Sequence, residues 1–93
     1  MLKYKLTKDA LNFLKSVPKK HAQQIIDKIN QLAENKNSVP TIKLQGFDNL
    51  YRGKSGEYRF IFRFENGIIN ILVLKIGKRN DGEVYKNLDS LDN

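Results

Sequence analysis

The sequence predicts a small α+β protein: a short N-terminal strand, an antiparallel helical hairpin, a three-stranded antiparallel meander that completes a small sheet, and a short C-terminal tail or helix. Two observations carry this prediction. Residues 7–35 repeat their apolar side chains at helical spacing, whereas residues 50–76 are rich in aromatic and β-branched residues. A chain of 93 residues is the size of one domain, so residues 1–93 are treated as a single unit.

The first half begins with "LKYKL" (2–6), whose alternation of apolar and polar residues is typical of a half-buried strand. Thr7 is a suitable N-cap for a helix to about Val17, and Pro18 suits the first turn of a second helix that ends near 35–37. The expected apolar stripes are Ala10, Leu11, Leu14 and Val17 on the first helix, and Ala22, Ile25, Ile26, Ile29, Leu32 and Ala33 on the second. Residues 40–49 are expected to form a loop.

The second half contains three predicted strands, at 50–54, 57–64 and 68–76. The dipeptides at 55–56 and 66–67, Ser-Gly and Asn-Gly, are expected to form two-residue turns between them. If residues 66–67 form the second turn, Phe62 lies opposite Ile71 and Tyr58 lies opposite Lys75.

This register gives the middle strand two unlike faces. The first face is aromatic and is expected to pack against the helical hairpin; it carries Tyr58, Phe60, Phe62 and Phe64. The second face mixes two arginines with aliphatic residues: Arg59, Ile61, Arg63, Leu72 and Leu74. A solvent-facing side is rarely so apolar. We therefore expect it to be partly covered, either by a partner protein or by the chain's own tail through Val84, Leu88 and Leu91.

The charge of the chain favours a polyanionic partner. Its formal net charge is +7, and all of its arginines fall between residues 52 and 79. An excess this large favours nucleic acid, an acidic protein or a membrane face. Arginine binds phosphate through two parallel hydrogen bonds, which singles out residues 52–79 as the candidate site. The alternative is an ordinary, well-solvated basic surface.

Other kinds of chemistry find little support in the composition. The chain has no cysteine, which excludes disulfides and thiolate metal sites and fits a reducing, cytoplasmic setting. The N-terminus lacks a signal-peptide core, and no apolar stretch is long enough to span a bilayer. The acidic residues form no obvious metal cluster, so we expect a metal-independent site without a cofactor. The only histidine, His21, is expected to be an exposed surface residue.

Three segments together resemble one known family. "KLQG", "LYRGKSGEYRFIFRF" and "ILVLKIGKRNDGEVY" are similar to the RelE toxins of bacterial and archaeal toxin–antitoxin systems, within the RelE/ParE superfamily. The most specific pieces are "GEYR" and the closing "VLKIGKR" with "EVY". The resemblance implies a ribosome-dependent endoribonuclease that cuts messenger RNA in the A site of the 30S subunit. It also implies a cognate, RelB-like antitoxin as partner.

The resemblance also assigns roles to residues. Arg59 of "EYR" corresponds to the arginine that contacts the scissile phosphate, and Arg79 of "GKR" to a second catalytic arginine. Tyr85 of "EVY" corresponds to a tyrosine that stacks on a base and helps to orient the attacking 2′-hydroxyl. Lys54, from the basic pair of "YRGK", is the candidate proton acceptor. Residues expected to bind RNA without taking part in the chemistry are Arg52, Lys78 and Arg63.

The sequence also allows purely structural roles for these residues. Arg59 and Arg63 could be solvated strand arginines, and Tyr85 could be an aromatic cap on the tail. Position 84 is Val where some relatives carry a histidine, which favours RelE-type over YoeB-type chemistry. The alternative functions are a ParE-like gyrase inhibitor and a non-catalytic basic binding module.

Overall fold

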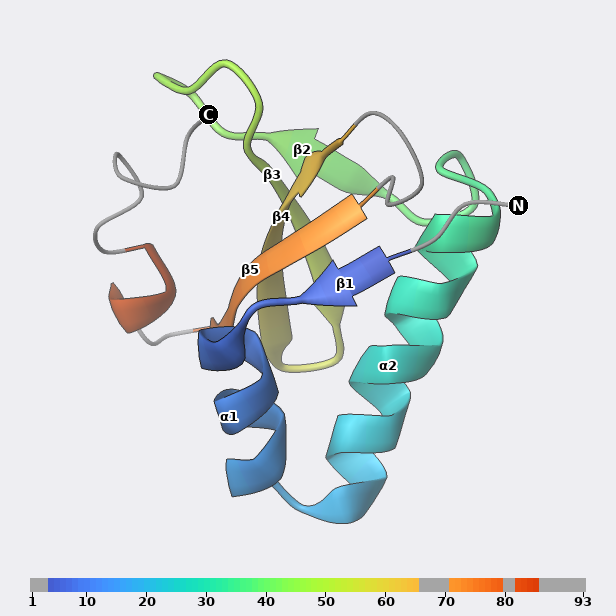
Figure 1. The fold of residues 1–93 in the computed structure, drawn as a ribbon, viewed down its shortest axis with the longest axis vertical. Coiled ribbons are helices and arrows are strands. Elements are labelled where there is room, and N and C mark those ends of the chain that lie inside the picture. The colour runs from blue at the N-terminus through green and yellow to red at the C-terminus, as the bar shows by residue number, and fades with distance from the viewer. Residues whose placement is uncertain (1–3, 66–70, 80–81, 86–93) are drawn as a thin grey trace.

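The computed structural model describes residues 4–65, 71–79 and 82–85; for residues 82 and 83 it describes the backbone alone. The elements in chain order are β1 (Tyr4–Leu6), α1 (Lys8–Ser16), α2 (Lys19–Glu34), β2 (Thr41–Lys43), β3 (Tyr51–Ser55), β4 (Tyr58–Phe64), β5 (Ile71–Lys78) and a 3₁₀ turn, η1 (Gly82–Tyr85). A short strand, two helices and then a mainly antiparallel sheet confirm the predicted α+β fold (Figure 1).

The five strands form one sheet in the order β1-β5-β4-β3-β2. β1 pairs in parallel with β5, and the other neighbours are antiparallel. The edge strand β2 falls where the sequence predicted a loop, so that prediction was wrong. β2 has three residues, too few to show alternation, and its Ile42 is 50% exposed; only its pairing with β3 defines it as a strand.

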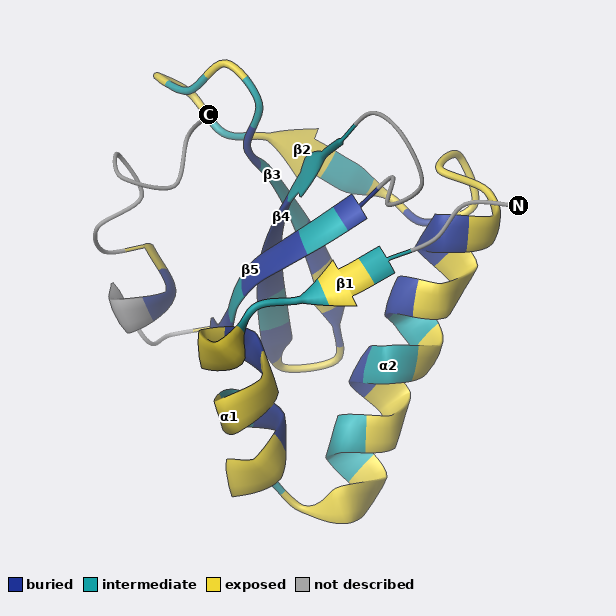
Figure 2. Ribbon diagram, viewed as in Figure 1, coloured by how far each residue is buried: buried dark blue, intermediate teal, exposed yellow. Residues whose placement is uncertain are grey.

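The two helices follow the sequence closely. Thr7 is the N-cap of α1: its hydroxyl accepts a hydrogen bond from the Ala10 backbone N–H at 3.2 Å and donates one to the Leu74 carbonyl at 2.7 Å. This residue therefore starts the helix and ties it to β5. The α2 face that was predicted to be apolar is buried toward the sheet (Figure 2). Within the described residues, neither helix is long and apolar enough to cross a membrane.

One position of the predicted α1 stripe was wrong. Leu11 is 42% exposed, and Phe13 packs against the core instead. The ring of Phe13 makes an edge-to-face contact with Tyr58, with 6.0 Å between the centroids. A short helix needs only one side in contact with the sheet, and the larger aromatic side chain takes that place.

The core lies between the helices and the aromatic face of the sheet. Its centre is formed by the fully buried side chains of Ile25, Ile29, Leu32, Phe60, Phe62, Ile71 and Val73. Gly53 of β3 lies beneath the Phe60 ring, where a Cβ would come within 2.2 Å of a ring carbon. A second cluster, on the opposite face, consists of Leu50, Ile61, Leu74 and Val84, flanked by Leu44, Phe47 and Leu72. We call that opposite side the open face.

The strand register differs from the predicted one. Phe62 lies opposite Val73 and not Ile71, and Tyr58 lies opposite Lys78 and not Lys75. The expected turn at 66–67 is outside the described residues. The first hairpin is also shifted by one residue: Ser55 lies opposite Tyr58, so the turn is at 56–57, with Gly56 at a φ of +59°. Glycine adopts this backbone conformation without the steric cost that a Cβ adds.

A β-bulge in β5 explains why the difference from the predicted β4–β5 register is larger at Tyr58 than at Phe62. Phe62 pairs with Val73 but Ile61 pairs with Lys75, so Leu74 is an extra residue between them. Regular alternation would turn Lys75 into the core and Ile76 out of it. The bulge instead keeps both Val73 and Ile76 in the core, while Leu74 packs in the second cluster and Lys75 lies opposite Ile61 on the open face. The side chains of β5 thus reach suitable surroundings on both faces.

The contact beneath Phe60 gives a prediction about stability. We expect Gly53→Ala to lower the free energy of unfolding by about 1–3 kcal/mol, because its Cβ overlaps the Phe60 ring. The double variant Gly53→Ala/Phe60→Leu should lose less than the two single variants added together, since leucine leaves room for the new methyl group. Urea unfolding of the four proteins measures this coupling. Strict additivity would contradict the packing described here.

Candidate nucleic-acid interface

The open face of the sheet brings basic residues from neighbouring strands together. β3 contributes Arg52 and Lys54, and β4 contributes Arg59. Lys54 and Arg59 are direct cross-strand partners, and Gly77 of β5 lies on the other side of Arg59. Like charges opposite each other in a sheet are destabilising. A bound anion between the two side chains would remove that cost.

Arg59 is held at the turn between β3 and β4. Its Nη1 donates hydrogen bonds to the carbonyl oxygens of Gly56, at 3.2 Å, and Tyr58, at 3.1 Å. Both bonds use one nitrogen of a guanidinium that has five N–H donors. The side chain is half-buried, so the turn fixes its position while part of it stays accessible.

Arg79 reaches the same turn from β5. Its backbone N–H donates to the Glu57 carbonyl at 2.6 Å, which continues the β4–β5 pairing one residue past the end of β5. Both Arg79 and the preceding Lys78 are exposed. The two arginines predicted to contact phosphate are therefore both tied to the backbone of residues 56–58.

Tyr85 is placed by its neighbour Val84. Val84 is 2% exposed and packs in the second cluster, with its Cβ only 2.9 Å from where a Cβ on Gly77 would lie. The glycine thus leaves a flat spot on β5 against which η1 packs. Tyr85 itself is 37% exposed, and its hydroxyl accepts a hydrogen bond from Arg52 Nη1 at 3.3 Å.

The cover expected over the open face is therefore present in part. Val84 does cover it, as predicted, whereas Leu88 and Leu91 lie outside the described residues. The sequence did not predict the contribution of the loop before β3, which adds Leu44 and Phe47 to the same cluster. These residues carry no strand or helix periodicity, so nothing in their spacing indicated that they fold back onto the sheet.

A comparison with known families identifies the fold. The family described as "ParE toxin of type II toxin-antitoxin system, parDE" matches residues 4–82 of the chain. The chain belongs to this toxin family. Its membership confirms the resemblance to the RelE/ParE superfamily, and the protein is accordingly a toxin of a type II toxin–antitoxin system. No curated protein matched the sequence.

Solved toxin structures have the same fold. The chain is 27% identical to a chain of the archaeal RelE–RelB complex from Pyrococcus horikoshii OT3, with a TM-score of 0.70 over 85% of this chain and 96% of the other. It is 21% identical to a double arginine-to-alanine mutant of E. coli toxin RelE in the free state, with a TM-score of 0.77 over 97% and 96% of the two chains. The intact E. coli RelBE complex matches at 19% identity and a TM-score of 0.69, over 87% of the toxin described here and 100% of that chain.

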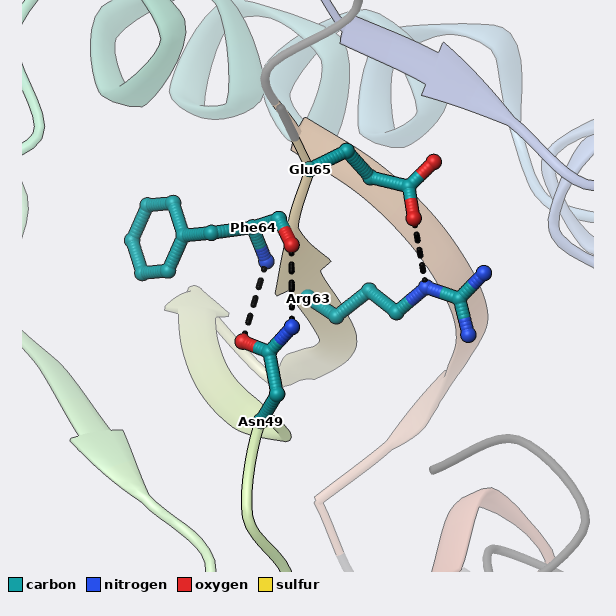
Figure 3. Close-up of polar contacts among 4 residues, drawn as sticks. All are labelled: Asn49, Arg63, Phe64 and Glu65. Atoms are coloured by element: carbon teal, nitrogen blue, oxygen red, sulfur yellow. Dashed lines mark hydrogen bonds and ion pairs between the residues drawn. The ribbon is translucent and has the colours of Figure 1, made fainter. Parts of the chain in front are cut away.

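Arg63 lies apart from the other basic residues of this toxin. It is four residues along β4 from Arg59, roughly 13 Å away at the rise of a β-strand. Its Nε forms an ion pair with Glu65 at 2.9 Å (Figure 3). Beside it, the Asn49 side chain hydrogen-bonds to the N–H and carbonyl of Phe64. Within the described residues, Arg63 is thus the predicted site residue that pairs with a carboxylate.

Two residues have surroundings that the sequence did not indicate. His21, expected to be exposed, is half-buried, and its Nδ1 lies 2.8 Å from the Tyr58 hydroxyl. Lys75, expected opposite Tyr58, lies opposite Ile61, on the strand position that the bulge turns toward the open face. The first contact joins residues far apart in the chain, and the second depends on the bulge. Neither leaves a local pattern in the sequence.

The basic surface is not an enclosed pocket. A pocket of about 320 Å³ lies between α1 and β5, lined by Asp9, Asn12, Phe13, Lys75, Ile76, Gly77 and Val84. Its lining includes none of the seven residues predicted for the site. In the described part of the toxin, no cluster of three or more histidine and acidic side chains is placed to hold a metal ion. The arrangement suits an extended polyanion lying across the strands better than a small ligand.

The contact between Gly77 and Val84 can be tested. We expect Gly77→Ala to displace η1, because the new Cβ would lie closer to Val84 than side-chain carbons normally approach. Nuclear Overhauser contacts between Arg52 and Tyr85 should weaken in this variant. They should recover in Gly77→Ala/Val84→Ala, which removes the side chain that is displaced. Unchanged contacts in Gly77→Ala would show that η1 does not depend on this glycine.

Proposed function

We propose that this toxin is a metal-independent, ribosome-dependent endoribonuclease that cuts messenger RNA in the 30S A site. The observation that supports the proposal is the convergence of Lys54, Arg59, Arg79 and Tyr85 on one region from β3, β4, the end of β5 and η1. Their number and type match the residues on which the likeness to RelE depends. No other region of the described chain combines arginines, a lysine and an accessible aromatic ring in this way.

The proposed reaction is attack of an RNA 2′-hydroxyl on the adjacent phosphate. The new bond joins the 2′-oxygen to phosphorus as its proton passes to a base, and the bond to the 5′-oxygen breaks as that oxygen takes a proton from water. The products are a 2′,3′-cyclic phosphate and a 5′-hydroxyl. Arg59 and Arg79 stabilise the extra negative charge on phosphorus in the transition state. Tyr85 stacks on a base and keeps the nucleotide in the in-line geometry that the attack requires.

Lys54 is the proposed proton acceptor. It is exposed and directly opposite Arg59, so a phosphate bound by Arg59 would lie within its reach. Arg52 lies beside this group on the open face and is proposed to bind the RNA backbone. Lys78 is proposed to do so as well, although its strand position, opposite Tyr58, faces the helix side. Arg63 is proposed to do so more weakly, because Glu65 already pairs with it.

The open face of the sheet is also the surface proposed to bind an antitoxin. The P. horikoshii and E. coli relatives are solved as complexes of RelE with RelB, and we propose that this toxin likewise binds a RelB-like antitoxin. The net charge of +7 would speed association with an acidic segment, and the aliphatic residues beside the basic ones offer apolar area to bury. A target on the ribosome places its action in the cytoplasm.

A gyrase inhibitor is the second candidate function, because the matching family is described by its ParE members. Inducible expression followed by mapping of transcript ends separates the two. A ribosome-dependent endonuclease should produce new ends within translated reading frames. A gyrase inhibitor should leave transcripts intact and instead block supercoiling by purified gyrase, and a binding module should do neither.

The first functional prediction concerns the two arginines. We expect Arg59→Ala and Arg79→Ala each to lower single-turnover cleavage on programmed ribosomes about a hundredfold or more, because each removes a transition-state contact. Both should keep the wild-type circular dichroism spectrum. Lys36→Ala, which removes one exposed cation remote from the open face, is the matched control and should cleave normally. Full activity in a folded Arg59→Ala or Arg79→Ala variant would contradict the assignment.

The second prediction separates stacking from proton transfer at Tyr85. If the ring stacks on a base, Tyr85→Phe should lose little activity and Tyr85→Ala roughly ten- to a hundredfold, which is the range of base–aromatic stacking. If the hydroxyl moves a proton, the two variants should fail alike. Single-turnover rates decide between these outcomes. We expect stacking, because the ring of Tyr85 is exposed beside Arg52 and is accessible to a base.

A further inference from the structure

Tyr58 connects the helical hairpin to the backbone of residues 56–58, to which the two proposed catalytic arginines are hydrogen-bonded. Tyr58 is 8% exposed, and its ring contacts both helices: Phe13 of α1 at a centroid distance of 6.0 Å and His21 of α2 at 5.6 Å, both edge to face. Its hydroxyl lies 2.8 Å from His21 Nδ1, within hydrogen-bond distance. Buried tyrosine hydroxyls need a polar partner, and among the described residues His21 is the one that the structure gives to Tyr58.

The backbone around Tyr58 holds the groups proposed to contact phosphate. The carbonyls of Gly56 and Tyr58 accept hydrogen bonds from the Arg59 guanidinium. The carbonyl of Glu57, between them, accepts the backbone N–H of Arg79. A displacement of Tyr58 by a fraction of an ångström would therefore be passed to both arginines at once. The hydrogen bond at the hydroxyl adds a directional restraint to the packing of this ring in the core.

We propose that His21 is a positioning residue of this toxin: through the Tyr58 hydroxyl it fixes the backbone of residues 56–58 and thereby the placement of Arg59 and Arg79. The catalytic part of this inference rests on the proposed endonuclease function; the structural part does not. His21 does not touch the RNA in this proposal. It acts from the helix side of the sheet on a site that faces the other side.

The hydrogen bond tolerates either protonation state of the histidine. A neutral ring can accept the hydroxyl proton at Nδ1 or donate to the hydroxyl oxygen, depending on its tautomer, and a protonated ring donates. The contact thus serves as a brace and not as a pH switch. It is reachable by solvent, because both residues line a pocket of about 250 Å³ together with Gln24, Ser55, Gly56 and Glu57.

The structural part is tested by hydrogen exchange of the Arg79 amide, which requires no enzymatic activity. We expect His21→Ala and Tyr58→Phe each to speed this exchange about tenfold, and the double variant to add no further increase, because both single variants remove the same bond. His21→Asn should restore slow exchange, since its amide group can occupy the position of Nδ1. Gln24→Ala, which alters the same pocket beside the pair, is the matched control.

The catalytic part is tested by single-turnover cleavage on programmed ribosomes. We expect His21→Ala to lower the maximal rate about tenfold or more at an unchanged half-saturating ribosome concentration, because misplaced catalytic groups slow the chemical step. His21→Asn should recover most of the rate. A residue that only stabilised the fold would change the melting temperature without this selective loss at temperatures where the variant is fully folded.

The outcomes distinguish this inference from the proposed function. Unchanged Arg79 exchange in folded His21→Ala, or multiplicative effects of His21→Ala and Tyr58→Phe, would overturn the positioning role. Faster exchange together with no cleavage by the wild-type toxin would refute the endonuclease function while leaving the structural link intact. Faster exchange with a normal cleavage rate would overturn the catalytic part alone.

Discussion

The β-bulge at Leu74 is the constraint on which the rest of this toxin depends. β5 must place Val73 and Ile76, an odd number of residues apart, on the same core-facing side, and a regular strand cannot do so. The extra residue solves the conflict and turns Gly77 toward the open face, opposite Arg59. Regular pairing would have put Ile76 in that place and Lys75 in the core.

Several features of the site follow from that one residue. Because Gly77 has no side chain, η1 can pack against β5 through Val84, and this packing sets the position of Tyr85. The shifted register also aligns the end of β5 with the β3–β4 turn, where the Arg79 N–H meets the Glu57 carbonyl. The aliphatic second cluster and the basic site are thus two parts of one surface, joined at Gly77.

The two faces of the sheet differ in what they contribute to the protein. The helix side supplies most of the stabilising apolar burial, around Phe60 and Phe62. The open side carries the charges, including a lysine and an arginine placed directly opposite each other at some cost. Tyr58 links the two sides: its ring packs on the helix side, and its backbone carbonyl accepts a hydrogen bond from Arg59 of the open side.

The sequence by itself determined the class of the fold, both helices, four of the five strands and the residue types of the candidate site. Helical periodicity, the Thr7 cap and the aromatic alternation of 58–64 are local patterns, and each chain segment displays them before it meets any other. What only the tertiary structure decided was the register of β5, the strand β2, the burial of Leu44 and Phe47, and the pairing of His21 with Tyr58. These features depend on the packing of the complete folded chain. A bulge relieves a conflict between the two faces of the sheet. A three-residue edge strand or a long-range hydrogen bond forms only when its distant partner is in place. No short stretch of sequence therefore predicts these features.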